Sequence, residues 1–309
     1  MVAYATTSYN TGYMHGDIKG AFLSDTDTTN ASVSARNLIT NSTFDSDVNN
    51  WTGATNGVLT NPSNRLRITN TGGANGRAIS NTFSTTVGKR YIIRADLHDW
   101  NTGSTQFRIE IRQSGNDLVP ISGTSTKQTG FEYQLTSAGT GQYYVELYCL
   151  AGDGNWVEYD NVYVFEAEQD RSVYGKGLSV YGTITKSAVA TGAELVAYGP
   201  FSDSNYLKQP YNSNLNFGTG AFSIMFWIKS ATHSAYSRIM NRVTDVANNR
   251  VEFYSDSGTN LVFYTRHNAS ATSVTVGNGS LILDQWQCCL LYTSPSPRDL
   301  STSRMPSSA

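Results

Sequence analysis

Two stretches of the chain, FRIEIR at 107–112 and YVELYC at 144–149, decide its fold class. In both, apolar residues alternate with charged residues or tyrosines. Successive side chains of a β-strand point to opposite faces, so this strict alternation indicates a strand with one buried face. The residues expected to point into the core are Phe107, Ile109, Ile111, Val145 and Leu147.

Similar short runs continue on both sides of these stretches, and clusters of turn-forming residues separate them. NTGGANG at 70–76 and AGDGN at 151–155 are two such clusters. No stretch has a sustained period of about 3.6 residues, which would indicate a helix. Many short strands separated by turns are typical of a sandwich or jelly roll, so we predict an all-β chain.

The composition agrees with strands and turns and excludes some function classes. Charged residues make up 15% of the 309 residues, and the formal net charge is −2. Binding to nucleic-acid phosphates needs clustered Lys and Arg, so we expect no nucleic-acid partner. No apolar run approaches the roughly 20 residues of a membrane span, and the N-terminus lacks the basic and apolar regions of a signal peptide. The length predicts about two domains.

The two ends of the central region carry related motifs. NLITNSTFDSDVNN at 37–50 is followed by Trp51, and YDNVYV stands at 159–164. This opening and this closing motif resemble those of the carbohydrate-binding module family 4/9 jelly roll, over about 36–167. The resemblance implies a two-sheet sandwich that binds carbohydrate.

A second pair of motifs lies in the last third of the chain. FSIMFWIK at 222–229 and DQW at 284–286 resemble segments of the laminin-G/concanavalin-A-like lectin jelly roll. In complete members of that family, the strand after the Trp and several more strands finish the sandwich. We therefore expect tandem jelly-roll β-sandwiches, of which the second is incomplete and has exposed strand edges.

The alternation stops in CCLLYTSPSPRDLSTSRMPSSA at 288–309, which holds three of the 7 prolines. This segment resembles translated sequencing-adapter read-through from a metagenomic assembly, and a disordered Pro/Ser-rich tail is the alternative. The short β-prone pieces on either side of the first jelly roll resemble modules of phage structural proteins. The predicted organisation is an N-terminal β-prone segment at 1–35, a carbohydrate-binding-module-like jelly roll at 36–167, a connecting β-segment at 168–200, a truncated laminin-G/concanavalin-A-like domain at 201–287 and an artefactual or disordered tail at 288–309.

The sequence contains no catalytic motif. A nucleophile elbow, a phosphate-binding loop and a zinc-binding spacing of His and Cys are all missing. Glu146 and Glu158 are a candidate carboxylate pair for glycoside hydrolysis, but two solvated strand glutamates are the favoured interpretation. We therefore predict that the protein is not an enzyme.

The aromatic residues indicate where a sugar would bind, because rings pack on the C–H faces of sugars while carboxylates and amides bind the hydroxyls. Tyr144, Glu146 and Tyr148 share the outward face of one predicted strand, with about 7 Å between successive members. We predict that they form a carbohydrate-binding platform. Trp100 and Trp156, at turn–strand junctions, are predicted to extend it at the rim. The alternative is that these rings cover a second buried face.

The family resemblance also implies a structural calcium ion where the first and last strands meet. The corresponding residues here are Asp45, after the opening Phe, and Asp160 of the closing motif. Carboxylate oxygens suit calcium, and such a clip would stabilise a sandwich without disulfides. The alternative is that both are ordinary turn and edge residues.

These observations predict a non-enzymatic glycan-binding structural protein, part of a phage tail or tail fibre that contacts polysaccharide on a host surface. The expected location is the virion, with a homo-oligomeric fibre whose weak sites act through avidity. The alternative is a binding-module fragment of a secreted polysaccharide-degrading enzyme or bacterial adhesin, located outside the cell. A third interpretation is an architectural spacer without a ligand, because fold alone does not determine function.

Overall fold

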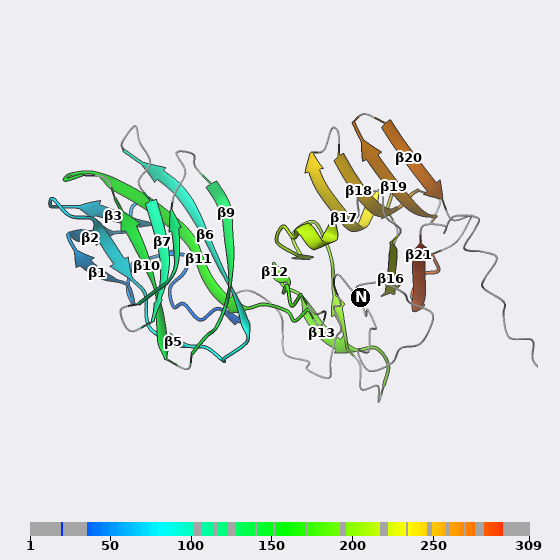
Figure 1. Cartoon of the computed structure of the whole chain (residues 1–309), viewed down its shortest axis with the longest axis horizontal. Coiled ribbons are helices and arrows are strands. Elements are labelled where there is room, and N and C mark those ends of the chain that lie inside the picture. Colours follow the sequence, from blue (N-terminus) through cyan, green and yellow to red (C-terminus); the bar gives the residue numbers. More distant parts are fainter. Residues whose placement is uncertain are drawn as a thin grey trace, which may run out of the picture. The chain divides into compact units, whose positions relative to one another are not determined.

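The chain forms two compact units, which divide between Leu215 and Asn216 (Figure 1). The elements named within the described residues of this computed structural model are β-strands and one short 3-10 helix, η1 (Ser213–Leu215), so the all-β prediction is confirmed. No helix among the described residues is long and apolar enough to cross a membrane. The structure describes residues 20, 36–101, 107–113, 116–122, 128–139, 141–150, 152–170, 172, 174–191, 196–216, 222–232, 234–245, 249–257, 260–268, 270–275 and 281–292.

The first unit is built on two antiparallel sheets. The six-stranded sheet has the order β1 (Thr52–Thr55), β4 (Gly76–Ile79), β10 (Gln142–Cys149), β7 (Phe107–Gln113) and β8 (Asn116–Ser122), with β5 (Phe83–Ser84) also paired to β10. The five-stranded sheet has the order β2 (Gly57–Thr60), β3 (Leu66–Asn70), β11 (Trp156–Glu166), β6 (Arg90–Trp100) and β9 (Gln128–Thr136). The pairs β2–β3 and β7–β8 join consecutive strands, and the other neighbours in each sheet are distant in sequence, as in a jelly-roll sandwich.

The core lies between these two sheets. Ile109, Ile111, Val145 and Leu147 are each at most 1% exposed and belong to one apolar cluster. Val157 and Tyr159 of the five-stranded sheet belong to the same cluster. The predicted inward face is therefore confirmed for these four residues, while the side chain of Phe107 lies outside the described residues.

The opening motif, at 37–50, lies along strand β11, which contains the closing motif. The two motifs are therefore hydrogen-bonded neighbours in the fold. The Leu38 N–H donates to the Val164 carbonyl over 2.8 Å, and the Val164 N–H donates to the Asn37 side chain over 2.9 Å. Phe44 is fully buried in the core.

A second apolar cluster lies on the other face of the five-stranded sheet. Ile92 of β6 and Phe165 of β11 point away from the main core and contact Val180, Ile184 and Tyr198. The covering strands are β12 (Ser179–Tyr181), paired with β15 (Tyr206–Lys208), and β13 (Thr185–Ala188), paired with β14 (Val196–Gly199). The segment predicted as a connection at 168–200 therefore packs on the first sandwich.

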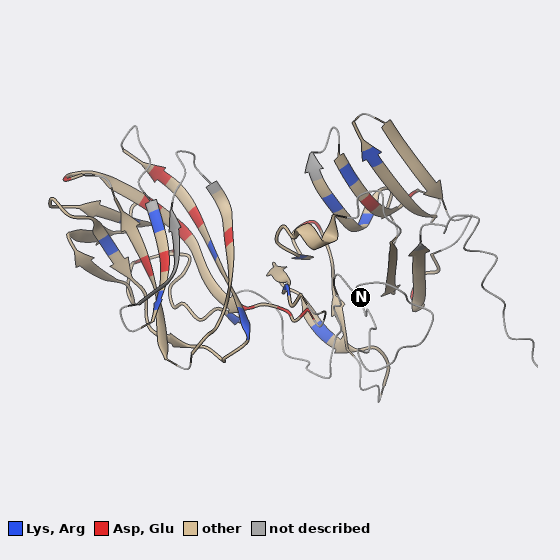
Figure 2. Ribbon diagram, viewed as in Figure 1, with Lys and Arg blue, Asp and Glu red and all other residues tan. Residues whose placement is uncertain are grey.

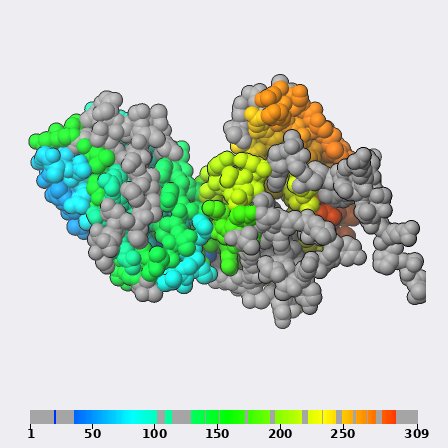
Figure 3. All heavy atoms as spheres, in the orientation of Figure 1, coloured from blue at the N-terminus to red at the C-terminus, as the bar shows by residue number. Residues whose placement is uncertain are grey.

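The second unit has a four-stranded antiparallel sheet and a two-stranded sheet. The first contains, in order, β17 (Ser237–Asp245), β18 (Asn249–Ser255), β19 (Leu261–His267) and β20 (Ser270–Thr275), and the second pairs β16 (Ser223–Ile228) with β21 (Gln287–Tyr292). Their shared core contains Phe226, Phe253, Leu261 and Leu281. Strands β19 and β20 (orange) are visible at the molecular surface in Figure 3.

Strand β21 corrects the prediction that an artefactual or disordered tail starts at residue 288. Residues 288–292 pair with β16 in register, Cys288 opposite Trp227 and Tyr292 opposite Ser223. Cys289 and Leu291 pack against the core of the second unit. The short run CCLLY thus has an alternation of its own, too short to be recognised as a strand beside the prolines that follow. Residues 293–309 lie outside the described part of the chain.

Candidate functional site

The outward face of the six-stranded sheet carries the predicted sugar platform. Because Val145 and Leu147 point inward, Tyr144, Glu146 and Tyr148 point outward, as predicted. The register places Glu146 opposite Glu110 of β7, and it places Tyr148 between Arg77 of β4 and Arg108 of β7. Strand pairing thus brings two carboxylates and several arginines together on one face.

These side chains form a closed network. Glu146 accepts hydrogen bonds from Arg77 Nη1 and Arg112 Nη1, both over 2.7 Å. The Tyr148 hydroxyl lies 2.7 Å from Glu110 Oε2 and 2.9 Å from Glu146 Oε2, so its single proton is shared between two carboxylates. Arg108 forms an ion pair with Glu110.

The network removes two of the three platform residues from solvent. Tyr148 is 6% exposed and Glu146 is 1% exposed, so the expectation that they offer an open platform is wrong. Two adjacent carboxylates need counter-ions, and the arginines that supply them also cover the tyrosine ring. The guanidiniums of Arg77 and Arg108 lie 5.9 Å and 5.4 Å from the centre of that ring. Tyr144 is half-buried.

Burial and the two carboxylates keep the Tyr148 hydroxyl protonated. Burial is the largest cause that raises the pKa of Tyr148, followed by its hydrogen bonds to Glu110 and Glu146. A group whose pKa is raised on folding stabilises the folded state below its unfolded pKa, which is about 10 for tyrosine. This contribution to stability is therefore present at all physiological pH values, and it is lost only in strong alkali.

A hollow of about 240 Å³ beside the Tyr148 ring is lined by Thr55, Ala74, Asn75, Arg77 and Tyr148.

The two predicted tryptophans belong to the opposite sheet and do not extend the platform. Trp100 is partly buried against the core. Trp156 is half-buried, and the Arg67 guanidinium lies 3.9 Å from the centre of its ring. Arg67 is held there by Glu158, which accepts from Nε over 3.0 Å and from Nη2 over 2.6 Å. One face of the Trp156 ring is therefore taken by arginine.

The same geometry separates the two glutamates considered for glycoside hydrolysis. Glu146 points outward from the six-stranded sheet, and Glu158 points outward from the five-stranded sheet, since its neighbours Val157 and Tyr159 are in the core. Sheets of a sandwich pack about 10 Å apart, so a full core lies between the two carboxylates. They do not flank one glycosidic bond.

Asp45 and Asp160 lie within electrostatic range of each other. Burial is the main cause that raises the pKa of Asp160, and the charges of Asp96 and Asp45 add to it. The Asp160 carboxylate accepts a hydrogen bond from the Asn161 N–H over 2.8 Å, and the Asp45 carboxylate accepts one from the Thr43 hydroxyl over 2.7 Å. Calcium takes six to eight oxygen ligands. No group of three or more His, Cys, Asp or Glu in the described part of the chain is placed to hold a metal ion, so a calcium ion at Asp45 and Asp160 would need backbone carbonyl, amide or water oxygens as its further ligands.

Replacing Asp160 with Asn tests the calcium prediction. The raised pKa means that the ionised carboxylate destabilises the folded state near neutral pH, and that this effect fades as the pH falls through the folded pKa. We expect Asp160→Asn to raise Tm by about 1–2 °C at neutral pH without calcium, and not at acidic pH. The exposed Asp153→Asn is the control. A Tm that rises with millimolar calcium in the wild type but not in Asp160→Asn would support the calcium site.

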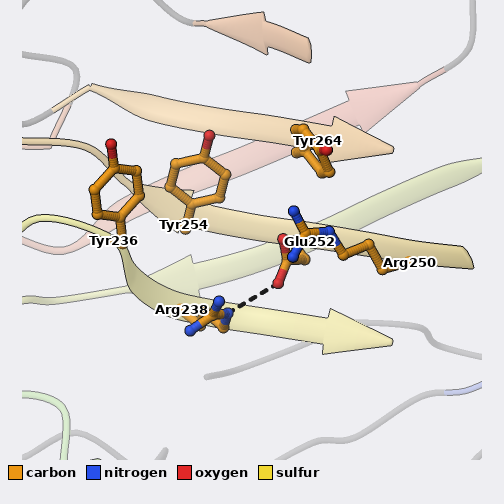
Figure 4. Close-up of a pocket in the computed structure, with 6 residues that line it drawn as sticks. All are labelled: Tyr236, Arg238, Arg250, Glu252, Tyr254 and Tyr264. Carbon is orange, nitrogen blue, oxygen red and sulfur yellow. Dashed lines mark hydrogen bonds and ion pairs between the residues drawn. The ribbon is translucent and has the colours of Figure 1, made fainter. Parts of the chain in front are cut away.

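A more open site lies on the four-stranded sheet of the second unit (Figure 4). We call it the tyrosine face. It encloses a hollow of about 260 Å³ and consists of Tyr236, Arg238, Arg250, Glu252, Tyr254 and Tyr264. Tyr236 is 68% exposed, and Tyr254 and Tyr264 are half-buried.

Local alternation in β18 builds this face. Phe253 points inward and packs on Phe226, with ring centres 5.5 Å apart, so Glu252 and Tyr254 point to the other side. Strand pairing adds Arg238 opposite Tyr254 and Tyr264 opposite Glu252. Figure 2 shows Lys and Arg positions on β17, β18 and β19 and an acidic position on β18.

The contacts within the tyrosine face orient its groups. Glu252 Oε1 accepts a hydrogen bond from Arg238 Nε over 2.9 Å, and Glu252 Oε2 lies 3.5 Å from Arg250 Nε. Arg250 in turn lies over the Tyr264 ring, 4.7 Å from its centre. Burial, followed by the charges of neighbouring groups, raises the pKa of Tyr254. Its hydroxyl is therefore protonated at neutral pH.

Tyr236 reaches this face from an unusual backbone conformation. Its φ is 63°, in the left-handed region that few non-glycine residues adopt. The Tyr236 N–H donates to the Ser255 carbonyl over 2.8 Å, which holds the turn before β17. The ring centres of Tyr236 and Tyr254 are 5.8 Å apart. Backbone strain of this kind clusters at functional sites.

Sequence reasoning missed the tyrosine face, although part of its signal was visible. RVEFY at 250–254 alternates polar or aromatic with apolar residues, which is the pattern used above for the first sandwich. Nothing in the sequence shows that Tyr236 and Tyr264 lie beside this strand, because turn geometry and strand register bring them there.

Fold and site define a protein of antiparallel β-sandwich type with a polar, tyrosine-rich sheet face. No protein-family model and no curated protein matches the chain. Among solved structures, it is similar to a family 4 carbohydrate-binding module, with 15% identity and a TM-score of 0.33 over 41% of this chain and 99% of that one. It is also similar to the N-terminal CBM22-1–CBM22-2 tandem of Paenibacillus barcinonensis Xyn10C, with 12% identity and a TM-score of 0.33 over 86% of each chain.

Proposed function

We propose that this protein binds carbohydrate without catalysing its cleavage, and that the tyrosine face of the second unit is its binding site. The observation that carries this proposal is the hollow of about 260 Å³, lined by three tyrosine rings and three charged side chains. Tyrosine offers an apolar ring for the C–H face of a sugar and a hydroxyl for its polar edge.

Accessibility favours this site over the platform predicted on the first sandwich. Tyr236 is 68% exposed, whereas Tyr148 is 6% exposed beneath its arginines. An exposed ring is desolvated only when ligand binds, so its burial contributes to affinity. A few ring contacts and hydrogen bonds provide about −4 to −8 kcal/mol, which corresponds to dissociation constants of about mM to µM.

Removing one ring tests the proposal. Aromatic anchors typically contribute more than about 1 kcal/mol, so we expect Tyr254→Ala and Tyr236→Ala each to weaken binding about tenfold. The measurement is calorimetric titration of the full chain with soluble bacterial, plant and algal polysaccharides found by a glycan array. Tyr133→Ala, which removes a tyrosine that is 42% exposed on the first unit, is the control and should bind like the wild type.

The same titration decides between the two units. Tyr144→Ala on the first sandwich is expected to leave affinity unchanged. A loss of binding with Tyr144→Ala, together with normal binding by Tyr254→Ala, would return the site to Tyr144, Glu146 and Tyr148. A chain that binds no polysaccharide on the array would contradict carbohydrate binding altogether.

We further propose that the protein is a structural component of a phage tail or tail fibre, in which homo-oligomers present many weak sites at once. Linked weak sites gain affinity through effective concentration. The alternative is a binding-module fragment of a secreted polysaccharide-degrading enzyme or of an adhesin. Light scattering gives the oligomeric state, and the flanking genes decide the context. A monomer encoded among polysaccharide-uptake genes would favour the alternative.

A further inference from the structure

We propose that the tyrosine face selects a sugar that carries a carboxylate, as in uronic acids, and that Arg238 and Arg250 bind this carboxylate. This inference rests on the proposed carbohydrate binding and names the ligand class of the same site. The hollow, at about 260 Å³, lies near the small end of ligand pockets and suits a short stretch of a polymer, such as a single sugar unit.

The charge of the face points to an anionic ligand. Two guanidiniums and one carboxylate line the hollow, which leaves a surplus of one positive charge. The whole chain has a formal net charge of −2, so this surplus is local. A neutral sugar needs no such surplus, whereas a uronate would neutralise it.

Glu252 prepares the two arginines for this role. Its side chain is 5% exposed, and it faces the Nε atoms of both arginines, at 2.9 Å from Arg238 and 3.5 Å from Arg250. The hydrogen bond from Arg238 to Glu252 comes from Nε, and the Arg238 side chain remains 53% exposed. The two terminal nitrogens of a guanidinium match the two oxygens of a carboxylate, which makes such pairs strong and directional.

The tyrosines complete a site for the sugar that bears this group. Tyr236 and Tyr254 present a pair of neighbouring rings with centres 5.8 Å apart, and Arg250 is stacked over Tyr264. Stacking limits the positions that the Arg250 guanidinium adopts, so less freedom is lost when it binds an anion. A ring platform next to an oriented cation fits a sugar whose carboxylate projects from the ring edge.

The matched ligands are polygalacturonate and its fully methyl-esterified form, which share a backbone and differ in the carboxylate charge. We expect the full chain to bind polygalacturonate at least about tenfold more tightly, and this preference to shrink as salt is raised. Arg238→Gln should remove most of the preference. Arg238→Lys keeps the positive charge but loses the paired terminal nitrogens of the guanidinium, so it should keep only part of the preference. Lys229→Gln, at an exposed position outside the hollow, is the charge-matched control and should keep it.

The outcomes separate the inference from the function on which it rests. Equal binding of both polymers, unaffected by Arg238→Gln, would overturn the carboxylate assignment and leave carbohydrate binding intact. Binding to neither polymer nor to any array glycan would reject both. Dextran sulfate bound as tightly as polygalacturonate would show general attraction of anions and would also overturn the assignment. A thermal melt of each variant confirms that the second unit is folded.

Discussion

Replacing Glu146 with Ala is expected to lower the stability of the first unit by about 3–5 kcal/mol, as is found when a buried ion pair loses one partner. Glu146 is 1% exposed and accepts from Arg77 and Arg112, each over 2.7 Å. Without it, Arg77 loses its carboxylate partner, and Arg112 keeps the longer ion pair with Glu110, at 3.8 Å. For a unit of this size, the corresponding fall in Tm is about 10 °C.

Differential scanning calorimetry of the full chain measures this effect, and Glu166→Ala is the matched control. Glu166 pairs with Lys89 over 2.9 Å, but the two side chains are 34% and 46% exposed. Exposed pairs are worth at most about 1 kcal/mol, so this change should shift Tm by only a few degrees. If both variants melted at the same temperature, the buried network would not have the stabilising role that we assign to it.

Ending the chain at Gln287 is expected to unfold much of the second unit. The truncation removes residues 288–292, which are the partners of β16 in register, and it removes Cys289 and Leu291 from the apolar core. Loss of a partly buried leucine and of a row of backbone hydrogen bonds costs about 4 kcal/mol. That is a large part of the total stability of a small unit.

Hydrogen exchange in the β16 peptide, residues 223–228, reports this change directly. We expect exchange there to become fast, while β6 of the first unit stays protected. A chain that ends after Tyr292 retains every strand described above and is the control. Unchanged protection of β16 after truncation at Gln287 would show that β21 is dispensable, and it would revive the prediction that the tail starts at residue 288.

The first sandwich shows how far pattern reasoning extends. Alternation correctly assigned Ile109, Ile111, Val145 and Leu147 to the core, because the side that a strand residue faces depends only on its place in the strand. It also placed Glu146 and Tyr148 on the outward side. It failed on their exposure, because that depends on β7 lying beside β10 with Glu110 opposite Glu146.

The candidate site divides in the same way. The alternation around Glu252 and Tyr254 is visible in the sequence. The hollow also needs Tyr236 from a turn and Tyr264 from the next strand, and no local pattern indicates them. Asp45 and Asp160 were paired through a family resemblance, and the structure adds that Asp96 shares their surroundings.

Local properties of the chain thus account for the all-β class, for strands β7 and β10 of the first sandwich and for the inward residues. Strand order and register account for the rest: the arginines over Tyr148, the strand after Trp286 and the tyrosine face. The reason is that the two faces of a strand follow from adjacent residues, whereas the neighbour that covers or opens a face comes from a distant part of the chain. Packing of the whole unit sets the position of this neighbour, and no short sequence pattern encodes that packing.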